Sequence, residues 1–154
     1  YRRFGYIGLD RARAPRAALR YQGMMRGLSE AGLSLVAEAM ADFPTSTQGG
    51  RKLLAELLAG GSAFDAVVFS NDDMAVGGLF HCLASGIRPR EELALFGFNA
   101  LEIGQSLPMP LSTIRSNRDM IGRIAATHIL ERPLRPPEPT IIDTGYEIVE
   151  GATA

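Results

Sequence analysis

Polar side chains follow three apolar segments of the sequence, at the points where buried strands would end. The residues are Asp10, Asn71 and Asn99, which supply one carboxylate and two amides. A carboxylate accepts hydrogen bonds, whereas an amide both donates and accepts them, so these groups could hold a polar ligand. The sequence offers no convergent acid, base and nucleophile beside them. We therefore expect a binding site and not an enzyme.

Each of these residues also has a purely structural interpretation. Asn71, Asp72 and Asp73 could cap a helix, because side-chain oxygens satisfy its free N–H groups and carboxylates favour its positive end. Asn99 could begin an Asx turn. Asp72 and Asp73 are poorly placed for shared acid–base work, since adjacent residues at a helix start point to different faces. Both interpretations stay open on the sequence alone.

The elements that would position these residues alternate between strand and helix. Apolar runs predict strands at 4–9, 35–40, 64–69 and 93–98, and short extended pieces near 111–114, 140–143 and 146–149. Apolar residues at helical spacing predict helices from 15 to about 31, from 46 or 47 to 59, from 72 or 73 to 85, and from 117 to about 130. This pattern favours an α/β three-layer sandwich, with a mostly parallel open sheet and helices on both faces. Ligands of such sheets bind beyond the carboxyl ends of the strands.

The composition excludes several classes of protein. A length of 154 residues suits one domain or a large subdomain. The net charge of −1, without a basic run, makes this chain alone a poor candidate for contacting DNA. No apolar run approaches the roughly 18 residues that a membrane span needs. The single cysteine and two histidines lack zinc-ligand spacing, so we expect no metal and no cofactor.

Four segments carry a more specific pattern. They are Arg20–Gly23 (RYQG), Val67–Gly77 (VVFSNDDMAVG), Leu95–Asn99 (LFGFN) and Pro110–Ile114 (PLSTI). In this order they resemble the arginine-x-x-glycine, ANDxMAxG, VxGYD and PxLTTI/V segments of the LacI/GalR family of bacterial transcription regulators. The string GFNALEIG at 97–104 also resembles the gluconate-operon repressor branch of that family. The resemblance covers nearly the whole chain.

The resemblance implies the effector-sensing part of such a regulator, with a periplasmic-binding-protein-like (Rossmann-like) fold. Residues 1–115 and 140–154 would form the C-terminal lobe, and the helix within 116–132 would be a crossover helix that normally packs on the N-terminal lobe. The helix-turn-helix domain would be absent from this chain, which begins almost directly in a strand and is expected to be a fragment. Operator DNA would be bound only through that missing domain, in the cytoplasm.

The same resemblance assigns ligand-binding roles to Arg20, Asn71 and Asn99, with Asp10 beside them. Asn99 stands where the family usually has Asp, so the cleft loses a negative charge and gains a hydrogen-bond donor. We therefore hypothesise that the effector, a sugar or sugar acid, is anionic and of the gluconate type. The alternative is neutral drift in a branch with an unrelated ligand.

The helix after Asn71 carries an apolar arc that is wider than packing on one sheet face requires. A homodimer contact would explain this arc, and the expected interface residues are Met74, Val76, Leu79, Phe80 and Leu101. The alternative is burial of the arc under the Leu101 loop of the same chain.

Two other functions share this fold class. A periplasmic sugar-binding protein of a transport system is the first, and the sequence upstream of Tyr1 would distinguish it from a regulator. An α/β enzyme such as a sugar-phosphate isomerase is the second, although fold alone does not decide function. The order of the four family-like segments favours the regulator.

Overall fold

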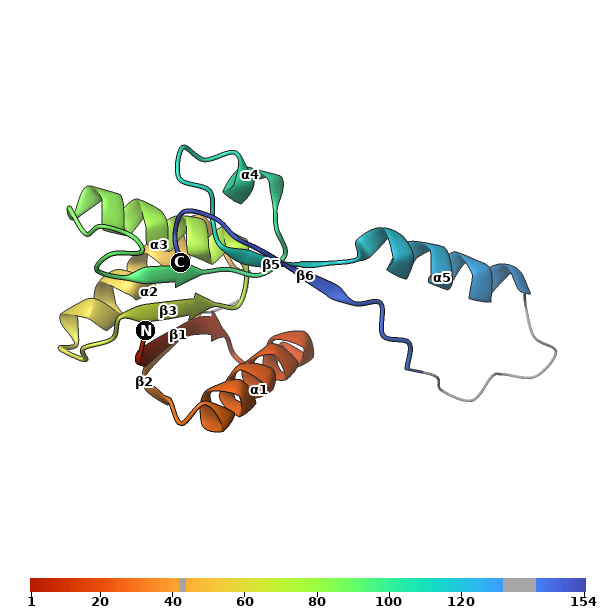
Figure 1. The fold of residues 1–154 in the computed structure, drawn as a ribbon, viewed down its shortest axis with the longest axis horizontal. Helices are drawn as coiled ribbons and strands as arrows, with labels where there is room; N and C mark the ends of the chain where they lie inside the picture. The colour runs from red at the N-terminus through yellow and green to blue at the C-terminus, as the bar shows by residue number, and fades with distance from the viewer. Residues whose placement is uncertain (42–43, 132–140) are drawn as a thin grey trace.

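The centre of the molecule is a parallel β-sheet (Figure 1). The computed structural model describes residues 1–41, 44–131 and 141–154. The sheet contains β1 (Arg3–Leu9), β2 (Ser34–Ala41), β3 (Ala66–Phe69) and β4 (Ala94–Phe96), in the order β2-β1-β3-β4. All three neighbouring pairs are parallel, so each strand is joined to the next by a helical crossover.

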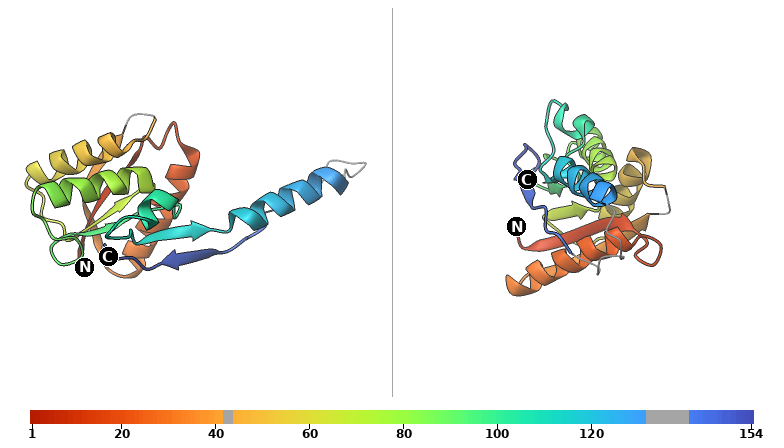
Figure 2. Two further views of the ribbon diagram at one scale, coloured as in Figure 1. Left: turned by 90° about the horizontal axis from the view of Figure 1, so that it is seen from above. Right: turned by 90° about the vertical axis from the view of Figure 1, so that its right-hand side faces the viewer.

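Helices cover both faces of this sheet (Figure 2). Helix α1 (Pro15–Glu30) lies on one face, and α2 (Thr47–Ala59) and α3 (Asp72–Ala84) lie together on the other. Local signals set the helix starts: Pro15 opens α1, and Ser46 caps α2 by accepting a 3.0 Å hydrogen bond from the Gly49 N–H. The predicted three-layer α/β architecture is confirmed.

The core lies between the sheet and the pair α2–α3. Its fully buried side chains include Ile7, Leu54, Val67, Phe69, Leu79 and Leu95. Two glycines let the helices approach one another closely. A Cβ at Gly77 would overlap the carbonyl oxygen of Thr47, and a Cβ at Gly50 would overlap that of Met74. The two helix backbones are therefore in direct contact at these positions.

The segment after α4 (Glu102–Gln105) returns to the edge of the sheet beside β4. Gly97 donates its N–H to the Ser112 carbonyl at 2.9 Å, and Asn99 donates to the Ile114 carbonyl at 2.9 Å. The C-terminus is fixed at the same edge, because the buried Thr153 hydroxyl donates to the Leu95 carbonyl at 2.8 Å. These bonds set the position of the loop that follows β4.

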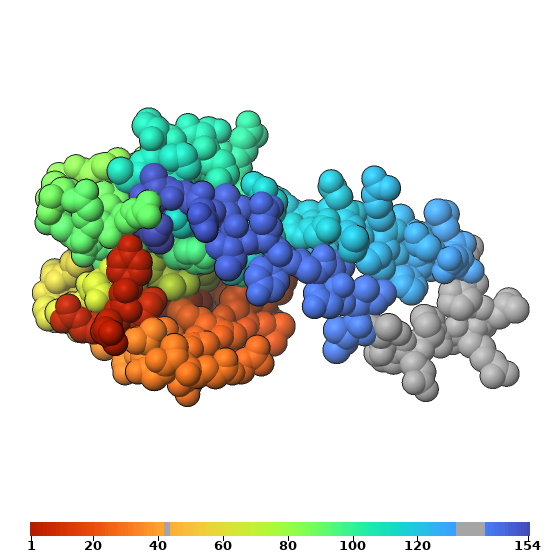
Figure 3. Space-filling view, in the orientation of Figure 1, coloured from red at the N-terminus to blue at the C-terminus, as the bar shows by residue number. Residues whose placement is uncertain are grey.

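An antiparallel pair leads from this edge to a projecting helix. It consists of β5 (Thr113–Ser116) and β6 (Tyr146–Val149), and α5 (Arg118–Glu131) extends beyond it, away from the body (Figures 1 and 3). None of the α5 residues is buried. Its exposed large apolar side chains are Met120, Ile121, Ile129 and Leu130. The described helices include none with the length and apolarity needed to cross a membrane.

One predicted strand is wrong within the described residues. Residues 141–143 carry no strand, and Ile141 is almost entirely exposed because the described chain places nothing against it. Residue 140, and the proline-rich segment 133–139, lie outside the described residues. The second predicted strand of this region is present as β6.

Candidate functional site

The strand order creates a crevice at one end of the sheet. The chain adds β2 on one side of β1 and then adds β3 and β4 on the other side, so the direction of winding reverses between β1 and β3. Loops that leave two such strands turn to opposite faces and open a space between them. A hollow of about 470 Å³ lies there, and its polar lining residues are Arg13, Arg16, Arg20, Ser70, Asn71 and Asn99.

Arg20 is fixed in this hollow by three contacts from other segments. Its Nη1 donates to the Ser70 carbonyl at 2.7 Å, and its Nη2 donates to Asn99 Oδ1 at 3.3 Å. Its guanidinium carbon lies 3.9 Å from the centre of the Phe98 ring. Burial and the positive charge of Arg16 lower the pKa of Arg20, but a guanidinium stays protonated in proteins. Arg20 is thus a positioned, partly desolvated cation.

Asn71 caps α3, as the structural interpretation of the sequence expected. Its Oδ1 accepts the Met74 N–H at 3.1 Å, and its Nδ2 donates to Thr45 Oγ1 at 2.9 Å. A carboxamide has two N–H groups and two acceptor lone pairs. Asn71 therefore keeps one donor and one acceptor position for a ligand while it serves as the cap.

Asn99 and Ala100 adopt backbone conformations that are rare outside glycine, with φ of 121° and 49°. The buried carboxylate of Asp72 fixes the segment that follows this turn. It accepts the Leu101 N–H at 2.6 Å and the Thr113 hydroxyl at 2.7 Å. Strained residues of this kind persist where the surrounding structure fixes them, and they often lie at ligand sites.

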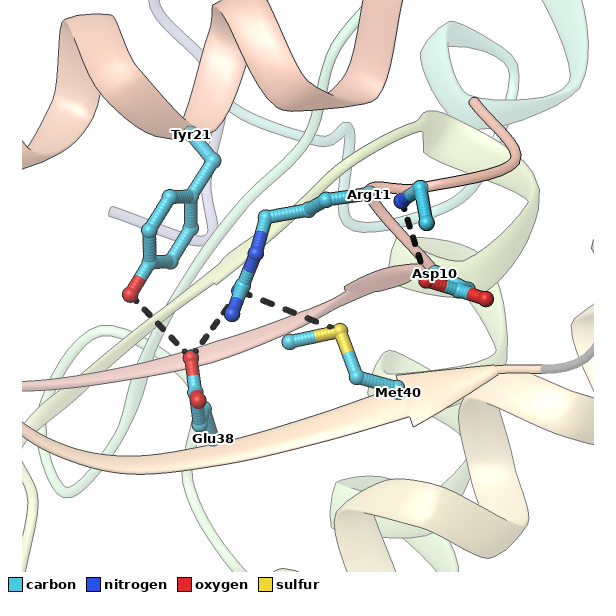
Figure 4. A network of polar contacts seen from close by, with 6 residues as sticks. Asp10, Arg11, Tyr21, Glu38 and Met40 are labelled. Atoms are coloured by element: carbon cyan, nitrogen blue, oxygen red, sulfur yellow. Dashed lines mark hydrogen bonds and ion pairs between the residues drawn. The ribbon is translucent and has the colours of Figure 1, made fainter. Parts of the chain in front are cut away.

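Asp10 lies at the edge of the hollow and is not among the residues of its wall. It accepts the Ala12 N–H at 3.0 Å (Figure 4), and its carboxylate lies 3.9 Å from Arg13 Nε. Arg11 is not among the residues that line the hollow, and it points toward Glu38 and Tyr21 (Figure 4). The structure thus brings Arg20, Asn71 and Asn99 together, whereas Asp10 folds back on its own turn.

Besides Arg13 and Arg16, which line the hollow, sequence reasoning missed two residues that position Arg20, namely Ser70 and Phe98. Ser70 contributes its carbonyl oxygen and Phe98 its ring face, both to Arg20. Neither role has a sequence signal of its own, since any residue has a carbonyl and a phenylalanine at a strand end is ordinary core. Their positions beside Asn71 and Asn99 were the available hint.

The hollow carries more positive than negative charge. Arg13, Arg16 and Arg20 line it, while Asp10 is paired with Arg13 and the Asp72 carboxylate is committed to backbone and hydroxyl donors. Neither acidic residue lines the wall. The arrangement favours a ligand that brings its own negative charge.

Burial corrects most of the predicted dimer interface. Met74, Val76 and Leu79 are at most 2% exposed, because α3 packs against both the sheet and α2, so their side chains belong to the core of this chain. Phe80 is 41% exposed and Leu101 is half-buried. Of the five predicted residues, only these two present a surface that a partner could contact.

Other chemical candidates are absent from the described part of the chain. Cys82 is buried, and burial raises the pKa of its thiol to about 11, which leaves almost no thiolate near neutral pH. Residues 1–41, 44–131 and 141–154 contain no group of three His, Cys, Asp or Glu side chains that could hold a metal ion.

Comparison with known proteins adds a family. The model of the periplasmic binding protein-like domain matches residues 1–154. The HTH-type transcriptional regulator GntR of Pseudomonas aeruginosa is 37% identical over 153 residues, which cover 96% of this chain and 43% of that protein. The regulator of the same name from Escherichia coli K12 is 27% identical, with 99% of this chain and 46% of that protein covered. The chain thus spans less than half the length of these curated relatives.

Solved structures give the same result. A LacI-family transcriptional regulator from Silicibacter pomeroyi superposes with a TM-score of 0.85 at 32% identity, covering 99% of this chain and 46% of that one. The lac repressor dimer bound to operator and the anti-inducer ONPF has a TM-score of 0.85 over 99% of this chain and 52% of that one, and at 20% identity it shows the fold alone. These relatives are transcription regulators, and they are neither enzymes nor transport proteins.

Proposed function

Because the chain belongs to the family of periplasmic-binding-protein-like domains, we propose that it is the effector-sensing part of a LacI-type transcription regulator. The observation that carries the proposal is the meeting of Arg20, Asn71 and Asn99, from three separate segments, around one hollow at the switch point of the sheet. Such crevices are the usual ligand sites of open α/β sheets.

The effector in this proposal is a small anionic sugar acid of the gluconate type. Three arginines line the hollow, and Asn99 places an uncharged amide beside Arg20. An arginine fork pairs well with a carboxylate, and the amides of Asn71 and Asn99 suit hydroxyl groups. A neutral sugar would leave the positive charge of the hollow uncompensated.

The second wall of the ligand cleft would come from a lobe that lies outside this chain. Residues 1–115 and 140–154 form one lobe in this proposal, and α5 packs on the other. The exposed apolar side chains of α5 support that assignment, because an isolated helix of this composition gains stability only by burying them. DNA binding belongs to a helix-turn-helix domain beyond the chain, and two copies act as a dimer.

The effector would act by population shift. A ligand held by both lobes stabilises the relative orientation in which it makes more contacts, and it changes DNA affinity only by that difference. A cytoplasmic regulator of this kind needs no chemistry at the site. Its response depends on which lobe orientation fits the operator.

A calorimetric titration of the full-length protein with D-gluconate tests the proposal. We expect saturable binding. Arg20→Leu should abolish it, because the variant loses the guanidinium group that Ser70, Phe98 and Asn99 hold in the hollow. Arg26→Leu is the matched control, since it removes the same charge from an exposed site on α1. Full binding by Arg20→Leu, or equal loss in both variants, would contradict the proposed site.

A further inference from the structure

Two guanidinium groups meet on Asn99. Arg20, from α1, donates to its side-chain Oδ1 at 3.3 Å, and Arg118, the first residue of α5, donates from Nη2 to its backbone carbonyl at 3.1 Å. The residue between the two cations is neutral. The bond from Arg118 also joins the loop after β4 to the helix that projects from the body.

Arg118 differs from neighbouring arginines in its lack of an ion pair with a described carboxylate. Arg115, on the adjoining strand, pairs with Glu147 at 2.9 Å, and Arg13 has Asp10 at 3.9 Å. In the three described ranges of the chain, no carboxylate oxygen lies within 4.0 Å of a guanidinium nitrogen of Arg20 or Arg118. Two like charges held by the side chain and the backbone of one neutral residue repel each other, and an anion between them would relieve that repulsion.

The donors of Arg118 suit such an anion. A guanidinium carries five N–H groups in a planar fork, and the bond to Asn99 uses one of them. Arg118 also borders an open hollow of about 550 Å³, which Asn117, Tyr146 and the acidic residues Asp119 and Glu147 line as well, whereas Arg20 lines the neighbouring effector hollow. Asn117 accepts the Met120 N–H at 3.1 Å and so caps α5, whose positive end faces the same region.

We propose that Arg118 is a second anion-recognising residue of the effector site, which binds the carboxylate of the effector together with Arg20. This inference rests on the proposed sensing function and extends it to the basis of specificity. Arg20 belongs to the body of the lobe, whereas Arg118 belongs to α5. A carboxylate held by both therefore ties the first turn of α5 to the body, and a neutral sugar does not.

The test uses calorimetric titrations of the full-length protein with D-gluconate and with D-glucose. We expect Arg118→Gln to raise the Kd for gluconate at least tenfold and to reduce its salt dependence, while any binding of glucose stays unchanged. Arg118→Lys should recover part of the gluconate affinity, because it restores the charge without the fork. Arg123→Gln is the matched control, since it removes an exposed arginine from the same helix.

The variants separate the two proposals. If Arg20→Leu abolishes gluconate binding but Arg118→Gln binds like the wild type, the role of Arg118 is overturned and the sensing function stands. Binding of glucose but not gluconate by the wild-type protein overturns the role of Arg118 and the proposed anionic effector, but leaves the sensing of a small molecule standing. Binding of neither overturns both proposals. Thermal unfolding of Arg118→Gln should match that of Arg123→Gln, and a lower midpoint would show a structural role instead.

Discussion

The hydroxyl group of Thr113 donates a hydrogen bond of 2.7 Å to the carboxylate of Asp72, 41 residues earlier in the chain, and both side chains are fully buried. The other carboxylate oxygen accepts the Leu101 N–H at 2.6 Å. An acid in the first turn of α3 thus fixes two later segments, and the strained turn at Asn99 directly precedes the first of them. The geometry of the site depends on this carboxylate.

Asp72→Asn should destabilise the chain by about 2 kcal/mol, because an amide presents an N–H₂ group to one of two buried donors. Chemical unfolding followed by circular dichroism measures the change. Asp73→Asn is the control, since it alters the same first turn of α3 at a half-buried position. Equal stability of the two variants would show that the bonds from Leu101 and Thr113 contribute nothing.

Phe98→Leu should weaken effector binding about twofold to fivefold with little loss of stability. Leucine keeps most of the apolar volume but loses the ring face above which the Arg20 guanidinium lies, a contact worth about 0.5–1 kcal/mol. Phe98→Tyr keeps the face and should bind like the wild type. Titration with D-gluconate provides the measurement. An equal loss of affinity in Phe98→Tyr and Phe98→Leu would contradict the stacking argument.

Gly77→Ala and Gly27→Ala should have opposite effects on stability. The new methyl group at Gly77 would overlap the backbone of α2, so α2 and α3 must separate at a cost of about 2 kcal/mol or more. At Gly27, on the surface of α1, nothing lies within 4 Å, so alanine should stabilise the helix by about 0.5–1 kcal/mol. Thermal unfolding of both variants tests the pair, and a neutral Gly77→Ala would refute the close packing.

The sequence predicted the order of strands and helices because those signals are local. Pro15 and Ser46 mark helix starts, and apolar runs mark buried strands. The burial of α3 was predicted less well. Its apolar arc was judged too wide for packing against one sheet face, and the excess was assigned to a dimer contact. Gly77 brings α2 against α3, and that second contact helps to bury Met74 within the chain. Periodicity within one helix carries no information about a neighbouring helix.

The site was predicted in part for the same reason. Asn71 and Asn99 could be found because each follows a strand, and the resemblance supplied Arg20. The contact of Arg20 with Phe98 joins residues 78 positions apart, and only the folded sheet brings them together. Asp72 was expected to act as a helix-end acid, but its bonds to Leu101 and Thr113 depend on where a later segment crosses the sheet edge.

Asp65 should make the stability of the chain depend on acid pH. Partial burial alone would raise the pKa of this carboxyl group, but the N–H groups of Arg3 and Arg2, at 2.9 Å from Oδ1, lower it below its ordinary value of 3.8. A depressed folded-state pKa stabilises the fold above the unfolded-state pKa, and this stabilisation is lost as the pH falls through the folded-state value. Because the group is largely accessible to water, we expect it to contribute only about 1 kcal/mol to the free energy of unfolding at pH 7.

Urea unfolding between pH 7 and pH 2.5 should show Asp65→Asn less stable than the wild type at pH 7 and nearly equal to it at the acid end. If the free energies of unfolding of the wild type and Asp65→Asn differ by the same amount at every pH, the carboxylate charge does not help to hold the start of β1.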